Sequence, residues 1–272
     1  MTKFLPDAPT RVILGVHGLG EFGGRYHKWA ENFVENQWAF YVHDQRGHGK
    51  TPGKQGIVSS YDLFLKDIDC VRRAAAAEHP GLPVFLHGHS MGGNIVLNYI
   101  LKGFAGDTGA DGSSLPPITG AVVISPWLKA FGQPPRFLIK PLRVLGGIFP
   151  NYTYKARISG LSRDARHLTD IDPESLLHSR LGLKIICQII QAGEYALAHG
   201  DKINLPTLLM SGKADTVVSP AAIDALAHKA GTRIEYKSWD MYHELHNDIG
   251  REDVFLRVKQ FIVHCPQAQP GS

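Results

Sequence analysis

The stretch PVFLHGHSMGGNIVLNYILK, residues 83–102, joins a short apolar run to a longer one through a glycine-rich hexapeptide. Residues 83–87 predict a buried strand, and residues 94–102 predict a helix. Between them lies the pattern Gly-x-Ser-x-Gly, in which a tight strand-to-helix turn projects the serine hydroxyl above a sheet. Larger side chains two positions on either side of Ser90 would collide with neighbouring backbone. We therefore expect Ser90 to be a nucleophile, against the alternative of a glycine-rich turn with an incidental serine.

Short apolar runs alternate with amphipathic stretches along most of the remaining chain. Five more runs predict strands, at 11–16, 39–43, 120–125, 205–210 and 233–238. The stretches between them predict helices at 26–36, 60–79, 221–229 and 254–263. Strands that are apolar throughout and alternate with helices indicate a mostly parallel sheet with helices on both faces. Together with the serine turn, this alternation indicates the α/β-hydrolase fold.

Residues 126–204 interrupt the alternation. They contain no convincing strand, but they include the apolar helical stretches FLIKPLRVLGGIF (137–149) and LGLKIICQII (181–190). We expect a core formed by residues 1–125 and 205–272, with 126–204 inserted as a helical cap after the strand that ends near Ser125. The apolar side chains of the cap either pack against one another and the sheet, or line a hydrophobic channel and expose an outer face to lipid.

The composition excludes several classes of protein. With 43% hydrophobic and 20% charged residues over 272 positions, the chain can bury a large core. Its net charge of +4 gives no basic stripe for nucleic acid. Cys70, Cys187 and Cys265 are an odd, widely spaced set that offers no disulfide framework. The first residues lack the apolar core of a signal peptide, and no run of ~18 apolar residues occurs. We therefore expect a soluble, cytoplasmic protein.

The fold orders the partners of the nucleophile along the chain as serine, then an acid, then a histidine, each on a loop after a strand. Asp215 follows the strand 205–210, where it can orient an imidazole. An Asx-turn or a helix cap near Ser219 is the alternative explanation of Asp215. His243 follows the last strand and precedes the last helix, so we expect it to be the base. Three other aspartates are less favoured as the acid: Asp201 precedes its strand, Asp224 falls on a helix, and Asp240 is too near the base. His264 is less favoured as the base because it lies at the wrong end of the last helix.

A nucleophilic attack on a carbonyl also needs backbone N–H donors for the oxyanion. The residue after the nucleophile, Met91, supplies one donor, and Leu19, in the loop after the strand 11–16, is the candidate for the other. His17 in that loop is better explained as a structural hydrogen-bonding residue than as a base. His243 and His246 form an H-x-x-H pair, but it lacks the i, i+4 spacing of a zinc-protease helix and a third ligand, so we expect no metal site.

Four segments carry a resemblance to a known family: LPVFLHGHSMGGNIVLNYI (82–100), HGLGEFGGRY (17–26), HDQRGHGKTPGKQG (43–56) and ISPWL (124–128). They are similar to the monoacylglycerol lipase group of α/β-hydrolases, also described as lysophospholipase-like or serine-aminopeptidase-like. The similarity extends from Arg11 to about Ile262. It implies the roles already assigned to Ser90, Asp215 and His243, with the oxyanion bound by Leu19 and Met91. It also places a further set near the entry loop and the alcohol-binding side: Glu21, Arg25, His89 and His246. From its position three residues after the base, His246 either lines the alcohol side of the pocket or supports the loop.

The resemblance implies a serine hydrolase that cleaves carboxylic esters, above all monoacylglycerols, through an acyl-serine intermediate and without a cofactor. A lysophospholipase, a short- or medium-chain carboxylesterase and an acyltransferase remain alternatives, as does a non-catalytic receptor. A peptidase is less favoured because the cap is apolar. The substrate would be a small lipid ester, and the cap would touch a membrane or lipid-droplet surface transiently.

The chain departs from this family at its start. The family has a β-hairpin and further residues before the strand that carries His17 and Gly18. Here that strand begins at about Arg11. We therefore expect the N-terminal hairpin to be reduced or missing, with residues 3–9 as a vestige.

Overall fold

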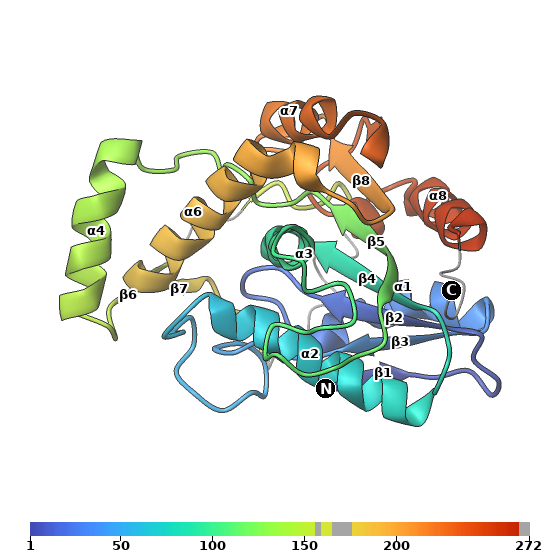
Figure 1. The fold of residues 1–272 in the computed structure, drawn as a ribbon. Coiled ribbons are helices and arrows are strands. Elements are labelled where there is room, and N and C mark those ends of the chain that lie inside the picture. The colour runs from blue at the N-terminus through green and yellow to red at the C-terminus, as the bar shows by residue number, and fades with distance from the viewer. Residues whose placement is uncertain (156–158, 165–175, 267–272) are drawn as a thin grey trace.

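The computed structural model describes residues 1–155, 159–164 and 176–266. Its centre is a seven-stranded sheet in the order β1-β3-β2-β4-β5-β8-β9 (Figure 1). The strand β1 is antiparallel to β3, and the other neighbouring strands are parallel. In chain order the strands of this sheet are β1 (Thr2–Phe4), β2 (Arg11–Val16), β3 (Trp38–Val42), β4 (Val84–His89), β5 (Ile118–Ile124), β8 (Thr207–Gly212) and β9 (Ile234–Trp239).

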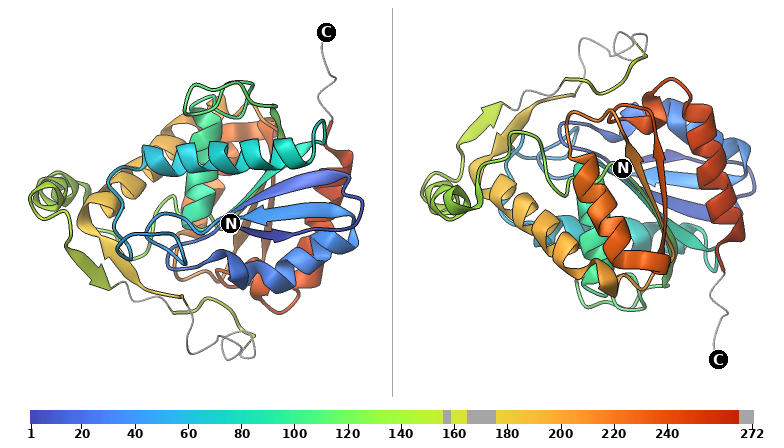
Figure 2. Two further views of the ribbon diagram at one scale, coloured as in Figure 1. Left: turned by 90° about the horizontal axis from the view of Figure 1, so that it is seen from below. Right: turned by 90° about the horizontal axis from the view of Figure 1, so that it is seen from above.

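Helices cover both faces of the sheet. On one face lie α1 (His27–Glu35) and α8 (Arg251–His264), whose buried residues share a hydrophobic cluster. On the other face lie α2 (Asp62–Glu78), α3 (Met91–Leu101) and α7 (Pro220–Ala230), which share the larger cluster. Figures 1 and 2 show the two layers from three directions. The short 3₁₀ helices are η1 (Gly23–Tyr26), η2 (Gly200–Lys202), η3 (Gly231–Arg233) and η4 (Leu245–Asn247).

The strand β2 shows why apolar runs form the central strands. Its Ile13 packs into the cluster under α1 and α8, whereas Leu14 packs into the cluster under α2 and α3. Successive side chains of a strand point to opposite faces, so a strand covered on both sides must be apolar at every position. The predicted α/β-hydrolase architecture, a mostly parallel sheet with helices on both faces, is confirmed.

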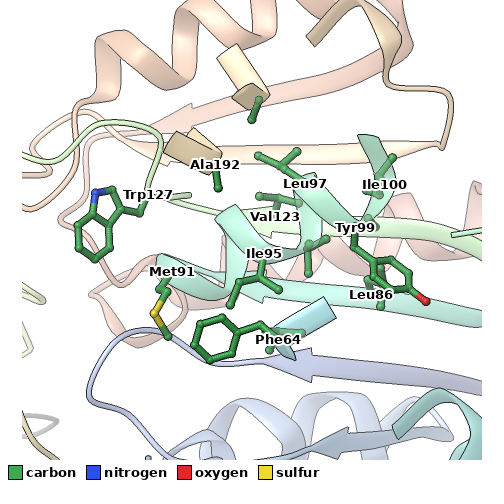
Figure 3. Close-up of a cluster of buried hydrophobic side chains, with 14 of the residues drawn as sticks. Phe64, Leu86, Met91, Ile95, Leu97, Tyr99, Ile100, Val123, Trp127 and Ala192 are labelled. Carbon is green, nitrogen blue, oxygen red and sulfur yellow. The ribbon is translucent and has the colours of Figure 1, made fainter. Parts of the chain in front are cut away.

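The helix α3 begins earlier than the sequence pattern indicates. We expected it to start at Asn94, but it starts at Met91, directly after Ser90. Glycines have low helix propensity, which hides the first turn from a pattern-based prediction. Close packing requires them here, because every residue from Met91 to Ile100 is buried. Figure 3 shows Met91 and Ile95 of α3 beside Phe64 of α2 within this core.

At the N-terminus, part of the predicted vestige is a strand. Residues 2–4 form β1, which pairs with β3 at the edge of the sheet, so that Thr2 lies opposite Val42 and Phe4 opposite Phe40. This three-residue strand is the contribution that residues 1–10 make to the sheet.

The described part of the segment 126–204 contains the helices α4 (Arg136–Ile148) and α6 (Leu183–His199), which cover the two apolar stretches predicted to be helical. The prediction that it contains no strand was wrong, because β6 (Thr153–Lys155) and β7 (Arg180–Gly182) form an antiparallel pair. Strands of three residues are too short to show a periodic pattern. The helix α6 packs against α3 and buries Ile185 and Ile189 in the same cluster as the sheet. The helix α4 lies outside α6, at one end of the molecule (Figures 1 and 2).

Candidate active site

Ser90 lies in a strained turn between β4 and α3. Its backbone has φ 54° and ψ −116°, in the left-handed half of conformational space that non-glycine residues rarely adopt. A Cβ at Gly88 would lie 2.6 Å from the carbonyl oxygen of Gly92, and one at Gly92 would lie 1.9 Å from that of Val16. Glycine is therefore required on both sides of the turn, as the sequence pattern predicted.

Backbone hydrogen bonds hold the turn in place. The N–H of Ser90 donates to Ile124 at the end of β5 over 3.0 Å. The carbonyl oxygen of Ser90 accepts from the N–H of Asn94 at 3.0 Å and from that of Trp127 at 2.9 Å. The turn is thus tied both to its own helix and to the chain that leaves β5. A strained backbone conformation of this kind persists only where the surrounding contacts hold it in place.

A continuous hydrogen-bonded chain joins Ser90, His243 and Asp215. The Nε2 atom of His243 lies 2.9 Å from the Oγ atom of Ser90, and its Nδ1 atom lies 2.7 Å from Oδ2 of Asp215. All three side chains are buried. The serine can pass its proton to the imidazole, and the buried carboxylate can hold the ring and stabilise its cationic form.

The loops that carry Asp215 and His243 follow neighbouring strands and pack closely. The N–H of Ala214 donates to the carbonyl oxygen of Met241 over 3.1 Å. A Cβ at Gly212 would lie 2.3 Å from the carbonyl oxygen of Tyr242, so only glycine allows this approach. The second carboxylate oxygen of Asp215, Oδ1, accepts the backbone N–H groups of Val217 and Val218 at 2.7 and 3.0 Å. These two contacts fix the direction in which Asp215 points.

The two proposed oxyanion donors come from the residue after Ser90 and from the loop after β2. Met91 is the first residue of α3, where a backbone N–H has no intrahelical acceptor. Leu19 lies in the loop after β2 and lines the cavity in front of Ser90. Glu21 stabilises this loop, because its Oε2 atom accepts the N–H of Gly18 at 2.7 Å.

His17 has the structural position that the sequence favoured. It is fully buried, its Nε2 atom accepts the N–H of Gln45 at 2.9 Å, and its Nδ1 atom lies 2.8 Å from the carbonyl oxygen of Gly18. Burial lowers the pKa of His17. A neutral imidazole that uses both nitrogens within the loop is unsuited to act as a base.

The loop after β2 is also in contact with the segment that precedes β7. The N–H of His178 donates to the carbonyl oxygen of Gly20 over 3.1 Å, and its Nε2 atom lies 2.9 Å from the carbonyl oxygen of Gly47. Gly20 has φ +76°, and a Cβ there would lie 1.8 Å from the carbonyl oxygen of His178. The position of this cap segment and the conformation of the oxyanion loop are therefore linked.

A buried ionic cluster forms one wall of the site. Nη1 of Arg25 lies 2.6 Å from Oε1 of Glu21 and 2.7 Å from Oε1 of Glu244, and its Nη2 atom donates to Oε2 of Glu244 at 2.9 Å. All three side chains are at most 7% exposed. Tyr26 donates to Glu21 at 2.9 Å, and Asn247 donates to Glu244 at 3.0 Å. The predicted pair Glu21 and Arg25 thus has a third charged member, Glu244, which sequence reasoning missed.

His89 faces this cluster from the nucleophile turn. Its Nδ1 atom lies 3.4 Å from Oε1 of Glu21, an ion-pair distance. Burial acts to lower the pKa of His89, but the charge of Glu21, the hydrogen bond to Glu21 and the charge of Glu244 together outweigh burial, so the pKa is raised. Burial likewise acts to raise the pKa of Glu21, yet His89 and Arg25 hold it well below its ordinary value. The two groups therefore stabilise each other in their charged forms.

Of the two positions expected for His246, the structure has the one that supports the loop. It is 2% exposed, stacks on Tyr26 at 5.4 Å between ring centroids, and packs against His89 at 4.6 Å. It does not line the cavity in front of Ser90. Burial lowers its pKa well below the ordinary value, so it is a neutral ring behind the wall of the site.

The cavity in front of Ser90 has a volume of about 490 Å³. Ser90, His243 and Leu19 line it, together with the ionic wall of Glu21, Arg25, His89 and Glu244. The remaining lining is largely apolar and includes Trp127, Ala130, Phe131, Tyr154, Leu161, Leu177, Val217 and Val218. Within the described ranges, no group of three or more His, Cys, Asp or Glu residues could hold a metal ion. The site thus combines a serine nucleophile with one charged wall and one apolar pocket.

Comparison with known proteins identifies similar chains. The family model described as serine aminopeptidase, S33, matches residues 7–250. The chain is 28% identical to a monoacylglycerol lipase of Mycolicibacterium smegmatis over 264 residues, covering 95% of this chain and 90% of that protein. It is 27% identical to an uncharacterised abhydrolase domain-containing protein of Dictyostelium discoideum, of which it spans 26%. The crystal structure of a monoacylglycerol lipase from Paleococcus ferrophilus superimposes with a TM-score of 0.81 at 29% identity, covering 97% of this chain and 98% of that one.

Proposed function

Because the chain belongs to the serine aminopeptidase S33 family of α/β-hydrolases, we propose that it hydrolyses carboxylic esters, with monoacylglycerols as its substrates. The observation that carries this proposal is the hydrogen-bonded chain Ser90–His243–Asp215, which opens into a mostly apolar cavity. Ester cleavage needs such a nucleophile, and a single acyl chain needs such a cavity.

In the first half of the reaction, Ser90 Oγ attacks the ester carbonyl and His243 Nε2 takes the hydroxyl proton. Negative charge then develops on the carbonyl oxygen, where the N–H groups of Leu19 and Met91 stabilise it. The bond to the alcohol breaks as His243 returns the proton to the departing oxygen. The products of this half are glycerol and an acyl group attached to Ser90.

In the second half, a water molecule attacks the acyl-serine carbonyl and gives a proton to His243. The same oxyanion donors stabilise the second intermediate, and the proton passes to Ser90 as the fatty acid leaves. Asp215 remains ionised and holds the imidazole in its working orientation throughout. No cofactor takes part in either half.

The two parts of the cavity wall suit the two parts of a monoacylglycerol. The apolar residues, among them Trp127, Phe131 and Val218, would surround the acyl chain. The charged wall of Glu21, Arg25 and Glu244 would meet the glycerol hydroxyls, which can both donate and accept hydrogen bonds. Residues 126–204 would act as the cap over this cavity and touch the lipid surface that supplies the substrate. No helix in the described part of the chain combines the length and the apolar character that crossing a membrane requires.

A substrate panel tests this function. Purified protein would be assayed with 1-monoacylglycerols of increasing chain length, lysophosphatidylcholine, p-nitrophenyl esters and amino-acid p-nitroanilides. We expect kcat/KM for the best monoacylglycerol to exceed that for lysophosphatidylcholine by at least ~10-fold, which corresponds to about 1.4 kcal/mol. Preference for lysophosphatidylcholine would make the protein a lysophospholipase. Turnover of only short p-nitrophenyl esters, or of the p-nitroanilides, would contradict the monoacylglycerol assignment.

A further inference from the structure

Asp248 is a fully buried carboxylate in the loop that carries the base. This base loop, residues 240–250, joins β9 to α8. A buried charge is costly unless hydrogen bonds or an opposite charge compensate it. Burial acts to raise the pKa of Asp248, but hydrogen bonds from the backbone N–H of Tyr242 and from Arg163 outweigh burial and lower the pKa. The side chain is therefore ionised, and its hydrogen-bond donors are what the buried charge holds in place.

The carboxylate of Asp248 closes the base loop on itself. Its Oδ2 atom accepts the backbone N–H of Tyr242, the residue before His243, at 2.9 Å. Its Oδ1 atom accepts the N–H of Ile249, at the other end of the loop, at 2.9 Å. Hydrogen bonds to an ionised group are stronger than those between neutral groups. The backbone that leads into His243 is therefore fixed by a charged acceptor.

The same carboxylate holds a part of the cap, residues 159–164, which we call the strap. Oδ1 of Asp248 accepts the backbone N–H of Arg163 at 2.8 Å, and Nε of Arg163 donates to Oδ2 at 3.0 Å. The strap also contacts the base loop directly, because the carbonyl oxygen of Leu161 accepts the N–H of Glu244 at 2.8 Å. Glu244 is the residue after His243. Asp248 thus fixes the backbone before the base, and the strap that it holds fixes the backbone after the base.

The strap reaches two further parts of the site. Oγ1 of Thr216, the residue after the acid, donates to the carbonyl oxygen of Ser159 at 3.4 Å. Ser159 and Leu161 also line the cavity in front of Ser90. The strap therefore contacts the acid loop, the base loop and the space that receives the ester, and Asp248 is the charged group that holds it.

We propose that Asp248 is a positioning residue for the reaction, which keeps His243 at hydrogen-bond distance from Ser90 by holding the base loop and the strap together. One carboxylate serves both segments, so the place of the strap and the place of the imidazole are linked. A displacement of about 1 Å in a reacting group can reduce the rate ~10²-fold. This role rests on the proposed catalysis by Ser90 and His243, but not on which ester is cleaved.

Asp248→Asn tests the role with the smallest change of shape. The amide has one acceptor oxygen, so it can accept the N–H of Tyr242 or that of Arg163, but not both. We expect kcat for a soluble p-nitrophenyl ester to fall by ~10–100-fold, well beyond any rise in KM. The low-field proton resonance of His243 Nδ1–H, which reports its hydrogen bond to the acid, should shift or broaden. Loosened packing alone would lower Tm without moving this resonance.

Asp164→Asn is the matched control. It makes the same chemical change on the strap, where Asp164 pairs with Arg251 of α8 at 3.0 Å. This variant should retain kcat within ~2-fold and leave the resonance in place. An unchanged kcat or an unchanged resonance in Asp248→Asn, or an equal loss of kcat in Asp164→Asn, would overturn the positioning role.

A second pair of variants tests the proposal even if Asp248→Asn does not fold. Arg163→Gln removes the cation from the strap side and should lower kcat by ~3–10-fold, whereas Arg163→Lys, which keeps a cation, should restore most of the loss. Wild-type kcat in Arg163→Gln, or an equal loss in both variants, would overturn the link between the strap and the base. Ser90→Ala is measured in parallel. If it retained the wild-type rate, the proposed function itself would fail, whereas an inactive Ser90→Ala beside a fully active Asp248→Asn would overturn only the positioning role.

Discussion

The Nε2 atom of His243 lies 2.9 Å from the Oγ atom of Ser90, although 153 positions separate the two residues in the sequence. Three loops at the carboxyl ends of β4, β8 and β9 bring the nucleophile, the acid and the base together. The sheet order β4-β5-β8-β9 places the acid and base loops beside one another and the nucleophile two strands away.

Replacing Asp215 by Asn should reduce kcat by ~10³–10⁴-fold. An amide can still accept the two N–H groups of the loop, but its NH₂ group cannot accept the proton that His243 Nδ1 donates. The imidazole would then lose its orientation and the stabilisation of its cation. The rate would be measured with a p-nitrophenyl ester, and the fold would be checked by circular dichroism. Asp224→Asn on the exposed face of α7 is the matched control; a loss of less than ~10-fold for Asp215→Asn would contradict the role of the acid.

Replacing Gly92 by Ala should prevent the nucleophile turn from forming. The new Cβ would lie 1.9 Å from the carbonyl oxygen of Val16 and 2.7 Å from that of His17, both backbone atoms that cannot rotate away. We expect a large loss of soluble protein or a fall in Tm of at least ~5 °C. Gly147→Ala in α4 is the control, because nothing lies within 4 Å of its Cβ. An unchanged Tm for Gly92→Ala would show that the turn is less constrained than the structure indicates.

Replacing Gly20 by Ala should lower kcat more than it changes KM. The Cβ would meet the carbonyl oxygen of His178, so either the cap segment or the oxyanion loop must move. Displacing one oxyanion donor reduces kcat by ~10²–10³-fold in other hydrolases. Gly53→Ala is the control, since Gly53 also has positive φ but nothing lies within 4 Å of its Cβ. If both variants lost the same activity, backbone strain alone would explain the result and the link to His178 would be unsupported.

Two histidines of β4 should affect stability in opposite directions with pH. Burial, reinforced by the nearby His89, lowers the pKa of His87 to about 3. The contribution of neutral His87 to the free energy of unfolding is therefore present above pH 6.5 and is lost as pH falls towards about 3. Burial acts to lower the pKa of His89, but Glu21 is the main cause of a net rise. The contribution of His89 to the free energy of unfolding is therefore present below pH 6.5 and is lost as pH rises through the folded-state pKa.

Urea unfolding between about pH 5 and pH 8.5 measures this contrast. The stability difference between the wild type and His87→Gln should grow as pH rises to 6.5. The difference between the wild type and His89→Gln should shrink as pH rises above 6.5. Parallel pH profiles for the two variants would mean that the ion pair of His89 with Glu21 does not form in solution.

The larger part of the fold could be predicted because long apolar runs have a distinctive period and length. The strand β2 has the predicted bounds, and each of the other central strands differs by one or two residues at either end. The strands β6 and β7 could not be predicted, because three residues are too few to show the alternating apolar pattern of a strand. The first turn of α3 was missed because tertiary packing overrides the low helix propensity of Gly92 and Gly93.

The candidate site was predictable where chain order constrains it. Ser90, Asp215 and His243 each follow a predicted strand in the order that the fold requires, and the structure brings them into contact. Glu244 was missed because its partner Arg25 is 219 positions away, and no local pattern connects them. Two positions remained open for His246, because a residue three positions after the base can face either the cavity or the core. Only the stacking of Tyr26 on His246 settles which side it faces.

The most direct test of the central claim is the hydrolysis of a monoacylglycerol by the wild type and by Ser90→Ala, followed as glycerol release. The account predicts steady turnover by the wild type and a fall of at least ~10⁴-fold for Ser90→Ala, with Tm unchanged. Retention of more than about a tenth of the wild-type rate by Ser90→Ala would contradict the account, because the ester would then be cleaved without the serine nucleophile.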